Sequence, residues 1–200
     1  MKSVRPREPQ IVILAAGFST RLGRPKALAK VHGITILASL SRKLAPLTSR
    51  PLAIVVPSRS ATGRLARSLG MICVENAERS LGLSRSVQLA LAHSAYAPGV
   101  LILPVDLTDL RPESLLRMLR RWRAHPRKLV ARRLAQRGVI PVLLPRHRFD
   151  LAGQLNGDTG LRNWLGALEP DDIILMDMPD AGTDIDTPQD LSAARRRFRR

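Results

Sequence analysis

Hydrophobic and polar positions divide this chain into two alternating kinds of segment. Short runs made almost wholly of apolar residues are typical of strands buried on both faces of a sheet. They lie at residues 11–16, 52–57 and 100–105, with a weaker run at 71–74. Between them, small and apolar residues recur at the spacing of an amphipathic helix. The helical sets are Ile34, Leu37, Leu40 and Leu44; Val87, Ala90, Leu91 and Ser94; and Leu115, Leu119 and Trp122. This alternation predicts right-handed βαβ units around one sheet, and therefore a single α/β domain.

Length and composition agree with one globular domain. The chain has 200 residues, of which 44% are hydrophobic, and it contains no linker or internal repeat. Residues 128–134 and 138–144 are expected to form a further strand pair. The single cysteine, Cys73, excludes an internal disulfide and a zinc site built on cysteines. The N-terminus has no apolar stretch of signal-peptide length, and no run approaches about 18 apolar residues, so we expect a cytoplasmic protein without a membrane partner.

The charge is large and unevenly distributed. Lys and Arg number 33 against 16 Asp and Glu, a net charge of +17, which invites a polyanionic partner such as nucleic acid. Two observations argue against nucleic acid. The chain has few aromatic residues for base stacking, with three Phe, one Tyr and two Trp, and it has no named nucleic-acid motif. The acids are concentrated: residues 150–190 hold ten of them against one base, Arg162. Carboxylates gathered in a chain that is short of them indicate a chemical task for some of them.

The loop after the first strand has the strongest chemical signal. In an open parallel sheet, ligands bind beyond the carboxyl ends of the strands, and residues 14–28 occupy that place. The loop offers small residues that let backbone N–H groups approach a ligand, two hydroxyls and three cations. These residues are Ala15, Ala16 and Gly17; Ser19 and Thr20; and Arg21, Arg24 and Lys26. They predict a polyphosphate site that follows neither the P-loop nor the dinucleotide-binding glycine pattern.

The spacing of five residues in this loop resembles the signature G-x-S-x-R-x-G-x-x-K of the MobA-like nucleotidyltransferases. The five are Gly17, Ser19, Arg21, Gly23 and Lys26. Two further matches extend the resemblance over residues 10–195. Asp106 follows a central apolar strand, as in the Asp-x-Pro motif of the family, although Thr108 stands in place of the proline. Residues 184–191 read Asp-Ile-Asp-Thr-Pro-Gln-Asp-Leu, which is similar to the C-terminal motif of the family.

The resemblance implies a single-domain, three-layer, Rossmann-like fold of the GT-A-like kind, with a mostly parallel central sheet. It divides the chain into an N-terminal extension at 1–9, the transferase domain at 10–195 and a basic tail at 196–200. It also implies an Mg²⁺-dependent transfer of a nucleoside monophosphate from a nucleoside triphosphate to a phosphorylated small molecule, with release of pyrophosphate.

The resemblance also implies roles for individual residues. Arg21, Lys26 and Asp106 would be catalytic. Asp106 and Asp186 would hold Mg²⁺, which takes one or two carboxylates together with phosphate oxygens. The nucleotide would contact Leu14, Ala15, Ala16, Gly17, Ser19, Arg21, Lys26 and Ser84. The acceptor would contact Asp158 and Arg162.

Within the family, the chain looks closest to the molybdenum cofactor cytidylyltransferases. It has Ala-Ala-Gly at 15–17, where guanylyltransferase relatives commonly have Ala-Gly-Gly, and it has similar segments at 82–87 and 157–162. These features favour CTP as the nucleotide and a molybdopterin-type acceptor, and they admit a molybdoenzyme or a chaperone as a protein partner. Where those enzymes usually show Arg-Gly-His-Pro, residues 137–141 read Arg-Gly-Val-Ile-Pro. This departure and Thr108 bear on the acceptor more than on the reaction.

Other interpretations stay open at the level of sequence. A sugar phosphate or another phosphorylated small molecule is an alternative acceptor. A basic protein that binds nucleic acid or a protein partner without catalysis is an alternative class. Asp184, Asp186 and Asp190 also suit a cap before the last helix, and Asp158 with Arg162 suits an ion pair within a helix.

Overall fold

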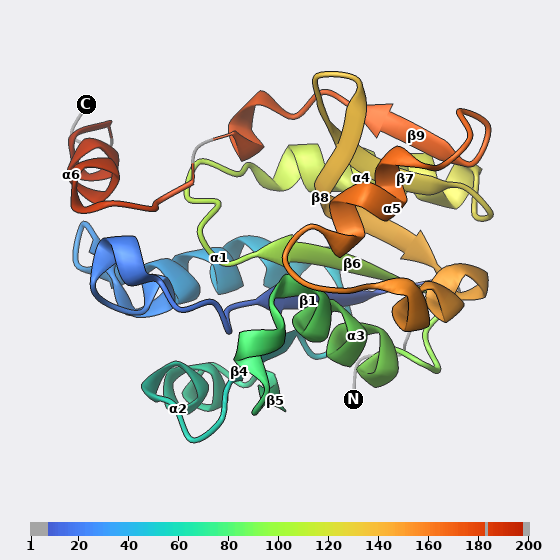
Figure 1. The fold of residues 1–200 in the computed structure, drawn as a ribbon. Helices are drawn as coiled ribbons and strands as arrows, with labels where there is room; N and C mark the ends of the chain where they lie inside the picture. The colour runs from blue at the N-terminus through green and yellow to red at the C-terminus, as the bar shows by residue number, and fades with distance from the viewer. Residues whose placement is uncertain (1–7, 183, 198–200) are drawn as a thin grey trace.

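The computed structural model describes residues 8–182 and 184–197, and in this part of the chain seven strands form one sheet (Figure 1). The strands are β1 (Gln10–Leu14), β4 (Ala53–Pro57), β5 (Ile72–Asn76), β6 (Gly99–Pro104), β7 (Leu129–Leu134), β8 (Arg137–Pro145) and β9 (Ile173–Met176). Their order is β5-β4-β1-β6-β8-β7-β9. β8 runs antiparallel to β6 and β7, and every other adjacent pair is parallel. The predicted mostly parallel sheet is therefore confirmed.

Helices cover both faces of this sheet and give the three layers of the predicted fold (Figure 1). They are α1 (Ile36–Leu44), α2 (Ala61–Ser68), α3 (Leu83–His93), α4 (Pro112–Ala124), α5 (Gly160–Gly166), α6 (Pro188–Arg197) and the 3-10 segment η5 (Arg146–Gln154). Apolar residues of α1, α2, α4 and α6 share one core cluster with Ile13 and Leu101 of the strands. Those of α3, α5 and η5 share a second cluster with Val12 and Ile102. Alternate side chains of a strand face opposite sides, so a strand covered on both sides must be apolar throughout.

A small hairpin and two helical turns lie between β1 and α1. They are η1 (Thr20–Leu22), η2 (Lys26–Leu28), β2 (Lys30–Val31) and β3 (Ile34–Thr35). The prediction that Ile34 belongs to the first helix is wrong. Thr35 caps that helix by accepting a hydrogen bond from the Ala38 N–H at 3.3 Å, so Ile34 is left in β3. α6 lies beside this hairpin, where Arg195 Nε donates to the Lys30 carbonyl at 3.1 Å (Figure 1).

The structure confirms the other predicted elements and adds some that the pattern does not predict. The expected strand pair is β7 with β8, and the second and third helical sets lie in α3 and α4. The elements without a prediction are β2, β3, α2, β9 and the six 3-10 segments of the described residues, which include η3 (Ala45–Leu47), η4 (Arg79–Leu81) and η6 (Pro179–Ala181). β9 has four residues, and apolar runs that short do not distinguish a strand from a helical turn. Of the helices that the structure describes, none has the length and apolar character needed to span a bilayer.

The predicted boundaries at the two ends fall partly outside the described residues. Of the N-terminal extension, residues 1–7 lie outside them. Glu8 is buried: it accepts a hydrogen bond from the Ser49 N–H at 2.7 Å, and its carbonyl accepts one from Arg50 Nε at 3.0 Å. Of the predicted basic tail, residues 198–200 lie outside, whereas α6 continues through Arg197. The division into extension, domain and tail stays a prediction.

Gly99, at the start of β6, tests the packing of the sheet against α4. A Cβ on Gly99 would lie 2.8 Å from the Leu144 carbonyl oxygen and 2.8 Å from Trp122 Cζ2. We predict that Gly99→Ala lowers the free energy of unfolding by about 1–3 kcal/mol, because the added methyl group has no room. As a control, Gly166→Ala should change it by at most about 0.5 kcal/mol, because a Cβ there meets only Arg137 Cδ, at 3.8 Å. Urea unfolding measures both variants, and equal stabilities would contradict this packing.

Candidate active site

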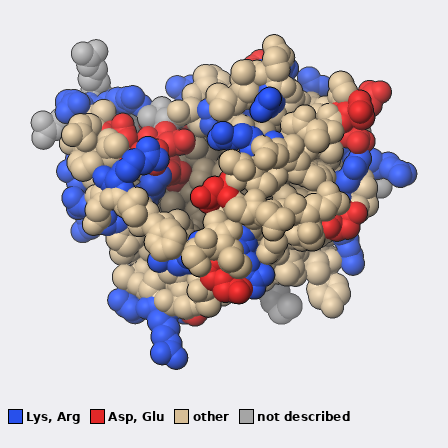
Figure 2. Space-filling view, viewed as in Figure 1, with Lys and Arg blue, Asp and Glu red and all other residues tan. Residues whose placement is uncertain are grey.

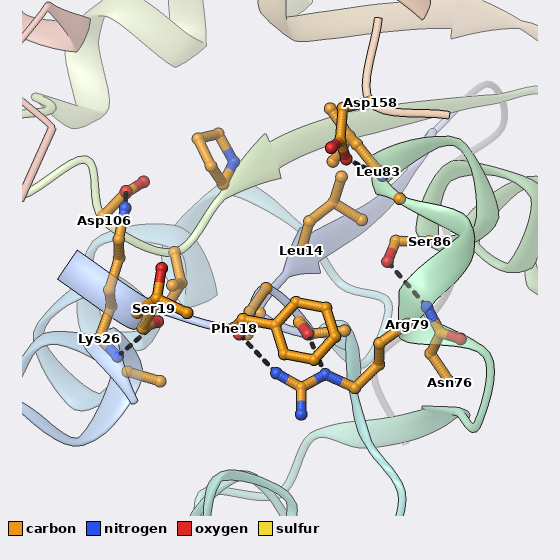
Figure 3. A pocket seen from close by; sticks show the side chains of 18 of the residues that line it. Leu14, Phe18, Ser19, Lys26, Asn76, Arg79, Leu83, Ser86, Asp106 and Asp158 are labelled. Carbon is orange, nitrogen blue, oxygen red and sulfur yellow. Dashed lines mark hydrogen bonds and ion pairs between the residues drawn. The ribbon is translucent and has the colours of Figure 1, made fainter. Parts of the chain in front are cut away.

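The carboxyl ends of β1, β5 and β6 meet at one edge of the sheet and border a pocket of about 540 Å³ (Figure 3). Its walls come from the loop after β1 (14–21, with 26 and 27), from residues between 76 and 86, and from the end of β6 (104–106). Asp158 and Asp186 complete them. Figure 2 shows this face of the molecule, with carboxylates and basic groups at the margins of a hollow. The site lies where open parallel sheets bind their ligands.

Lys26 is the electrostatic centre of the pocket. Its Nζ donates to Asp106 Oδ2 and to Asp186 Oδ1, both at 2.5 Å. Arg21 Nη2 donates to the other Asp186 oxygen, Oδ2, at 2.8 Å. Burial lowers the pKa of Lys26, but the charges and hydrogen bonds of the two carboxylates raise that pKa more, so it lies above its ordinary value. The lysine is therefore a fixed cation between two anions.

The chemistry of these carboxylates fits a divalent cation. Asp106 is buried, and its second oxygen, Oδ1, has no hydrogen-bond partner among the described residues. Mg²⁺ commonly takes one or two protein carboxylates and completes its shell with water and substrate phosphates. In the described ranges, no three His, Cys, Asp or Glu side chains gather in a way that could hold a metal without a substrate. Asp106 and Asp186 thus suit a metal that arrives with a phosphate ligand.

The C-terminal acidic motif caps the last helix, as one interpretation of the sequence suggests, and it also contributes Asp186 to the wall of the pocket. Thr187 and Asp190 form a reciprocal cap at the start of α6: Asp190 Oδ2 accepts from the Thr187 N–H at 2.8 Å, and Thr187 Oγ1 accepts from the Asp190 N–H at 3.2 Å. The hydrogen bonds from Thr187 hold the pKa of Asp190 below its ordinary value. The same Asp190 oxygen accepts from the Asp186 N–H at 3.1 Å, so the cap also fixes the backbone of Asp186. Partial desolvation, and then the negative charge of Asp106, raises the pKa of Asp184.

The loop after β1 brings most of its predicted residues to the pocket, whereas Arg24, one of the three cations expected to bind a polyphosphate, does not line it. The predicted residues that line it are Leu14, Ala15, Ala16, Gly17, Ser19, Thr20, Arg21 and Lys26. Ser19 adopts a left-handed conformation with φ 53°, and its Oγ accepts from the Lys26 N–H at 3.4 Å. Its carbonyl accepts from the Leu22 and Gly23 N–H groups, at 3.2 and 3.1 Å. The loop thus curls back on Ser19 and carries Arg21 and Lys26 to the same side.

Ser84 lies outside the lining of the pocket. It is buried in the first turn of α3, and its Oγ would lie 2.6 Å from a Cβ on Gly160. Ser86, two residues later, lines the pocket and accepts a hydrogen bond from Asn76 Nδ2 at 3.1 Å (Figure 3). The sequence offers two serines in one helical turn and does not reveal which of them faces the ligand.

The two residues predicted for the acceptor separate in the structure. Asp158 lines the pocket, and its Oδ1 accepts from the Leu83 N–H at 2.9 Å, so it caps the start of α3 (Figure 3). Arg162, on α5, is exposed and does not line the pocket. The segments around Gly82 and Asp158 pack directly together, because a Cβ on Gly82 would lie 2.7 Å from Asp158 Oδ1.

Sequence reasoning missed Asn76, Arg79 and Phe18, which also line the pocket. Asn76 is the last residue of β5, buried, and its side-chain oxygen accepts from the Glu78 N–H at 2.9 Å. Its position at the carboxyl end of a strand is a sequence signal for a ligand-binding residue, although the apolar pattern that predicts this strand is weak. Arg79 had no such signal, because it is one arginine among many.

The fold and the site together define a class. A family model of the MobA-like NTP transferase domain matches residues 11–172, and the chain belongs to that family. A curated relative, the probable molybdenum cofactor guanylyltransferase of Rhodopirellula baltica (strain DSM 10527 / NCIMB 13988 / SH1), is 30% identical over 122 residues. That match covers 60% of this chain and 58% of the relative, so the chain spans less than two thirds of the relative's length.

Two solved structures share the fold over nearly the whole chain. Rv0371c from Mycobacterium tuberculosis H37Rv has a TM-score of 0.72 and 25% identity, over 94% of this chain and 99% of that one. Molybdopterin-guanine dinucleotide biosynthesis protein A from Archaeoglobus fulgidus has a TM-score of 0.72 and 15% identity, over 94% of this chain and 97% of that one. The predicted family and fold class are therefore confirmed.

The contact of Lys26 with Asp106 makes a prediction about stability. Their side chains are 18% and 9% exposed, so removing either charge leaves the other poorly solvated. We predict that Lys26→Met and Asp106→Asn each destabilise the protein, and that the double variant loses about 1–3 kcal/mol less than the sum. Chemical unfolding of the four proteins measures this coupling.

The exposed pair of Arg67 and Glu75, with side chains 52% and 38% exposed, provides the matched control. Its coupling should stay below about 0.5 kcal/mol, because water screens it. Equal coupling in the two pairs would contradict a partly desolvated Lys26 centre.

Proposed function

We propose that this protein is a nucleotidyltransferase that moves a nucleoside monophosphate onto a phosphorylated small molecule and releases pyrophosphate. The observation that supports this best is the meeting of Lys26, Asp106 and Asp186 at one end of a pocket built by the loop after β1. Cations, carboxylates suited to a metal and backbone N–H groups are what a triphosphate requires. Membership of the MobA-like family points to the same chemistry.

The chemistry asks the protein to align two anions. An oxygen of the acceptor phosphate bonds to the α-phosphorus, the bond from that phosphorus to the bridging oxygen breaks, and pyrophosphate leaves with the electron pair. The nucleophile is already anionic, so the barrier is largely charge repulsion and alignment. Arg21 and Lys26 stabilise the leaving pyrophosphate. Asp106 and Asp186 would hold Mg²⁺, which would supply further neutralisation of phosphate charge.

For the nucleotide we propose CTP. The carboxyl end of β1 leads into Ala15-Ala16-Gly17, and Ala16 is buried in the wall of the pocket. Guanylyltransferase relatives commonly have glycine at the position of Ala16. A methyl group there leaves less room in the pocket for the base and so favours a pyrimidine over a purine. GTP is the second candidate, because the Rhodopirellula baltica relative is named a guanylyltransferase.

For the acceptor we propose a molybdopterin-type phosphate, by analogy with the names of the relatives. A sugar phosphate is the alternative. Pyrophosphate release by the purified protein with each acceptor, with Mg²⁺ and each triphosphate in turn, distinguishes them. Turnover with a sugar phosphate alone would overturn the acceptor without affecting the reaction class.

Removing a charge from the centre of the site should slow the reaction with the fold intact. We predict that Asp106→Asn and Lys26→Ala each lower kcat by about 10²–10³, because each removes a positioned charge that acts on the phosphates. Steady-state release of pyrophosphate measures the rate, and circular dichroism checks the fold. The control is Asp171→Asn, whose carboxylate is fully exposed beside Lys128, just before the amino end of β9 and outside the lining of the pocket. Wild-type turnover in either site variant would contradict the assignment.

The choice between CTP and GTP is tested by ligand-induced stabilisation. A ligand at 100 times its Kd raises the free energy of unfolding by about 2.7 kcal/mol. With Mg²⁺ present, we predict the largest thermal shift with CTP. We also predict that Ala16→Gly narrows the gap between CTP and GTP. A larger shift with GTP than with CTP in the wild-type protein would favour the second candidate.

A further inference from the structure

Arg79 makes contacts that the proposed reaction does not use. It begins η4, just after β5, and lies half-buried in the pocket wall. Its Nε donates to the Ala16 carbonyl at 2.6 Å, and its Nη2 donates to the Gly17 carbonyl at 2.9 Å. Its Cζ also lies 4.2 Å from the centre of the Phe18 ring (Figure 3). One side chain thus holds three consecutive residues that are 61 to 63 positions away in sequence.

We propose that Arg79 is a positioning residue that fixes the nucleotide-binding loop in the shape that receives the triphosphate. This proposal rests on the proposed function, since it names the group that holds the same site in shape. The sheet supports the loop as far as Ala15, whose N–H donates to the Val55 carbonyl at 2.9 Å. From Ala16 to Phe18, no backbone hydrogen bond between described residues holds the chain. Beyond the end of the sheet, the Arg79 guanidinium holds the loop through the Ala16 and Gly17 carbonyls.

The geometry of the peptide bond explains how this contact prepares a binding site. In a trans peptide, the carbonyl of one residue and the N–H of the next point in opposite directions. Because Arg79 binds the Ala16 and Gly17 carbonyls, it turns the Gly17 and Phe18 N–H groups away from itself. Neither N–H has a hydrogen-bond acceptor in the described part of the chain. Successive free N–H groups of this kind form a concave site for an anion.

The contact needs an arginine in particular. Its planar guanidinium presents Nε and Nη2 as a rigid fork to two neighbouring carbonyls while its flat face stacks on an aromatic ring, and a lysine ammonium has neither the fork nor the flat face. Phe18 is 61% exposed and provides that face. Among the described residues, no carboxylate pairs with Arg79; its neighbour Glu78 pairs instead with Arg85, at 2.7 Å. The positive charge of Arg79 therefore remains available to an anionic ligand in the pocket.

Two readouts test the proposal, one without ligand and one with it. In the ligand-free protein, ¹⁵N relaxation of Gly17 and Phe18 should show an ordered backbone in the wild type and a mobile one in Arg79→Ala. Calorimetric titration with CTP and with GTP, each with Mg²⁺, should show an affinity about tenfold weaker in Arg79→Ala. KM for the triphosphate should rise, while KM for the acceptor stays within about twofold. Arg64→Ala, an exposed arginine of α2, is the matched control and should change neither readout.

Further variants separate positioning from charge and from folding. Arg79→Lys keeps the charge but loses the fork, so it should recover little of the affinity; full recovery would overturn the positioning role. Phe18→Leu leaves both carbonyl contacts and removes the stacking face, so we expect a loss of about two- to fivefold. Wild-type affinity and an ordered loop in Arg79→Ala would overturn the proposal. If the wild type binds neither triphosphate, the proposed function fails, and the relaxation data still decide whether Arg79 orders the loop.

Discussion

One ammonium group joins the three parts of the chain on which the site depends. Lys26 Nζ lies 2.5 Å from oxygens of Asp106 and Asp186, which are 80 and 160 residues further along the chain. The contact requires β1 and β6 to be neighbours and requires the segment before α6 to return across the same edge of the sheet. Asp106 is buried, and its loss of hydration is offset only if a cation stays beside it. The electrostatics of the site and the topology of the sheet are therefore one constraint.

A second close contact lies on the other side of the pocket, between the segments around residues 82–84 and 157–160, and it depends on steric fit. Cβ atoms on Gly82 and Gly160 would lie 2.7 Å from Asp158 Oδ1 and 2.6 Å from Ser84 Oγ, so the two segments approach as closely as they do because both positions are glycine. The Ser84 N–H donates to the Gly157 carbonyl at 3.0 Å and links the two segments directly. Two motifs that the resemblance assigns to different substrates are thus one structural unit. A change at either one is expected to affect the binding of both substrates.

The sequence predicts the features that rest on local pattern or on fixed spacing. Fully apolar runs identify β1, β4 and β6, because a strand covered on both faces has no polar position to spare. The loop around Lys26 is recognised because its residues are adjacent in sequence. The choice between Ser84 and Ser86 depends on where the pocket lies relative to α3, because both serines are buried and only Ser86 lines it. The role of Arg79 depends on a contact across more than 60 residues. Both are set by tertiary packing, which a local sequence pattern does not contain.

The surplus of arginine has a structural role as well as a compositional one. With 16 acids for 33 bases, the bases cannot all pair one to one with carboxylates, and several arginines of the described part of the chain bind backbone carbonyls. Arg50, Arg79 and Arg195 donate to the carbonyls of Glu8, Ala16 and Lys30. Such contacts satisfy the hydrogen-bonding capacity of the backbone carbonyls but leave the positive charge of the arginines uncompensated. Under the proposed function, that charge would attract polyanions to the pocket, and the free N–H groups of the loop after β1 would select among them by shape. The high net charge would then supply general attraction, and the backbone that Arg79 holds would supply the selectivity for a triphosphate.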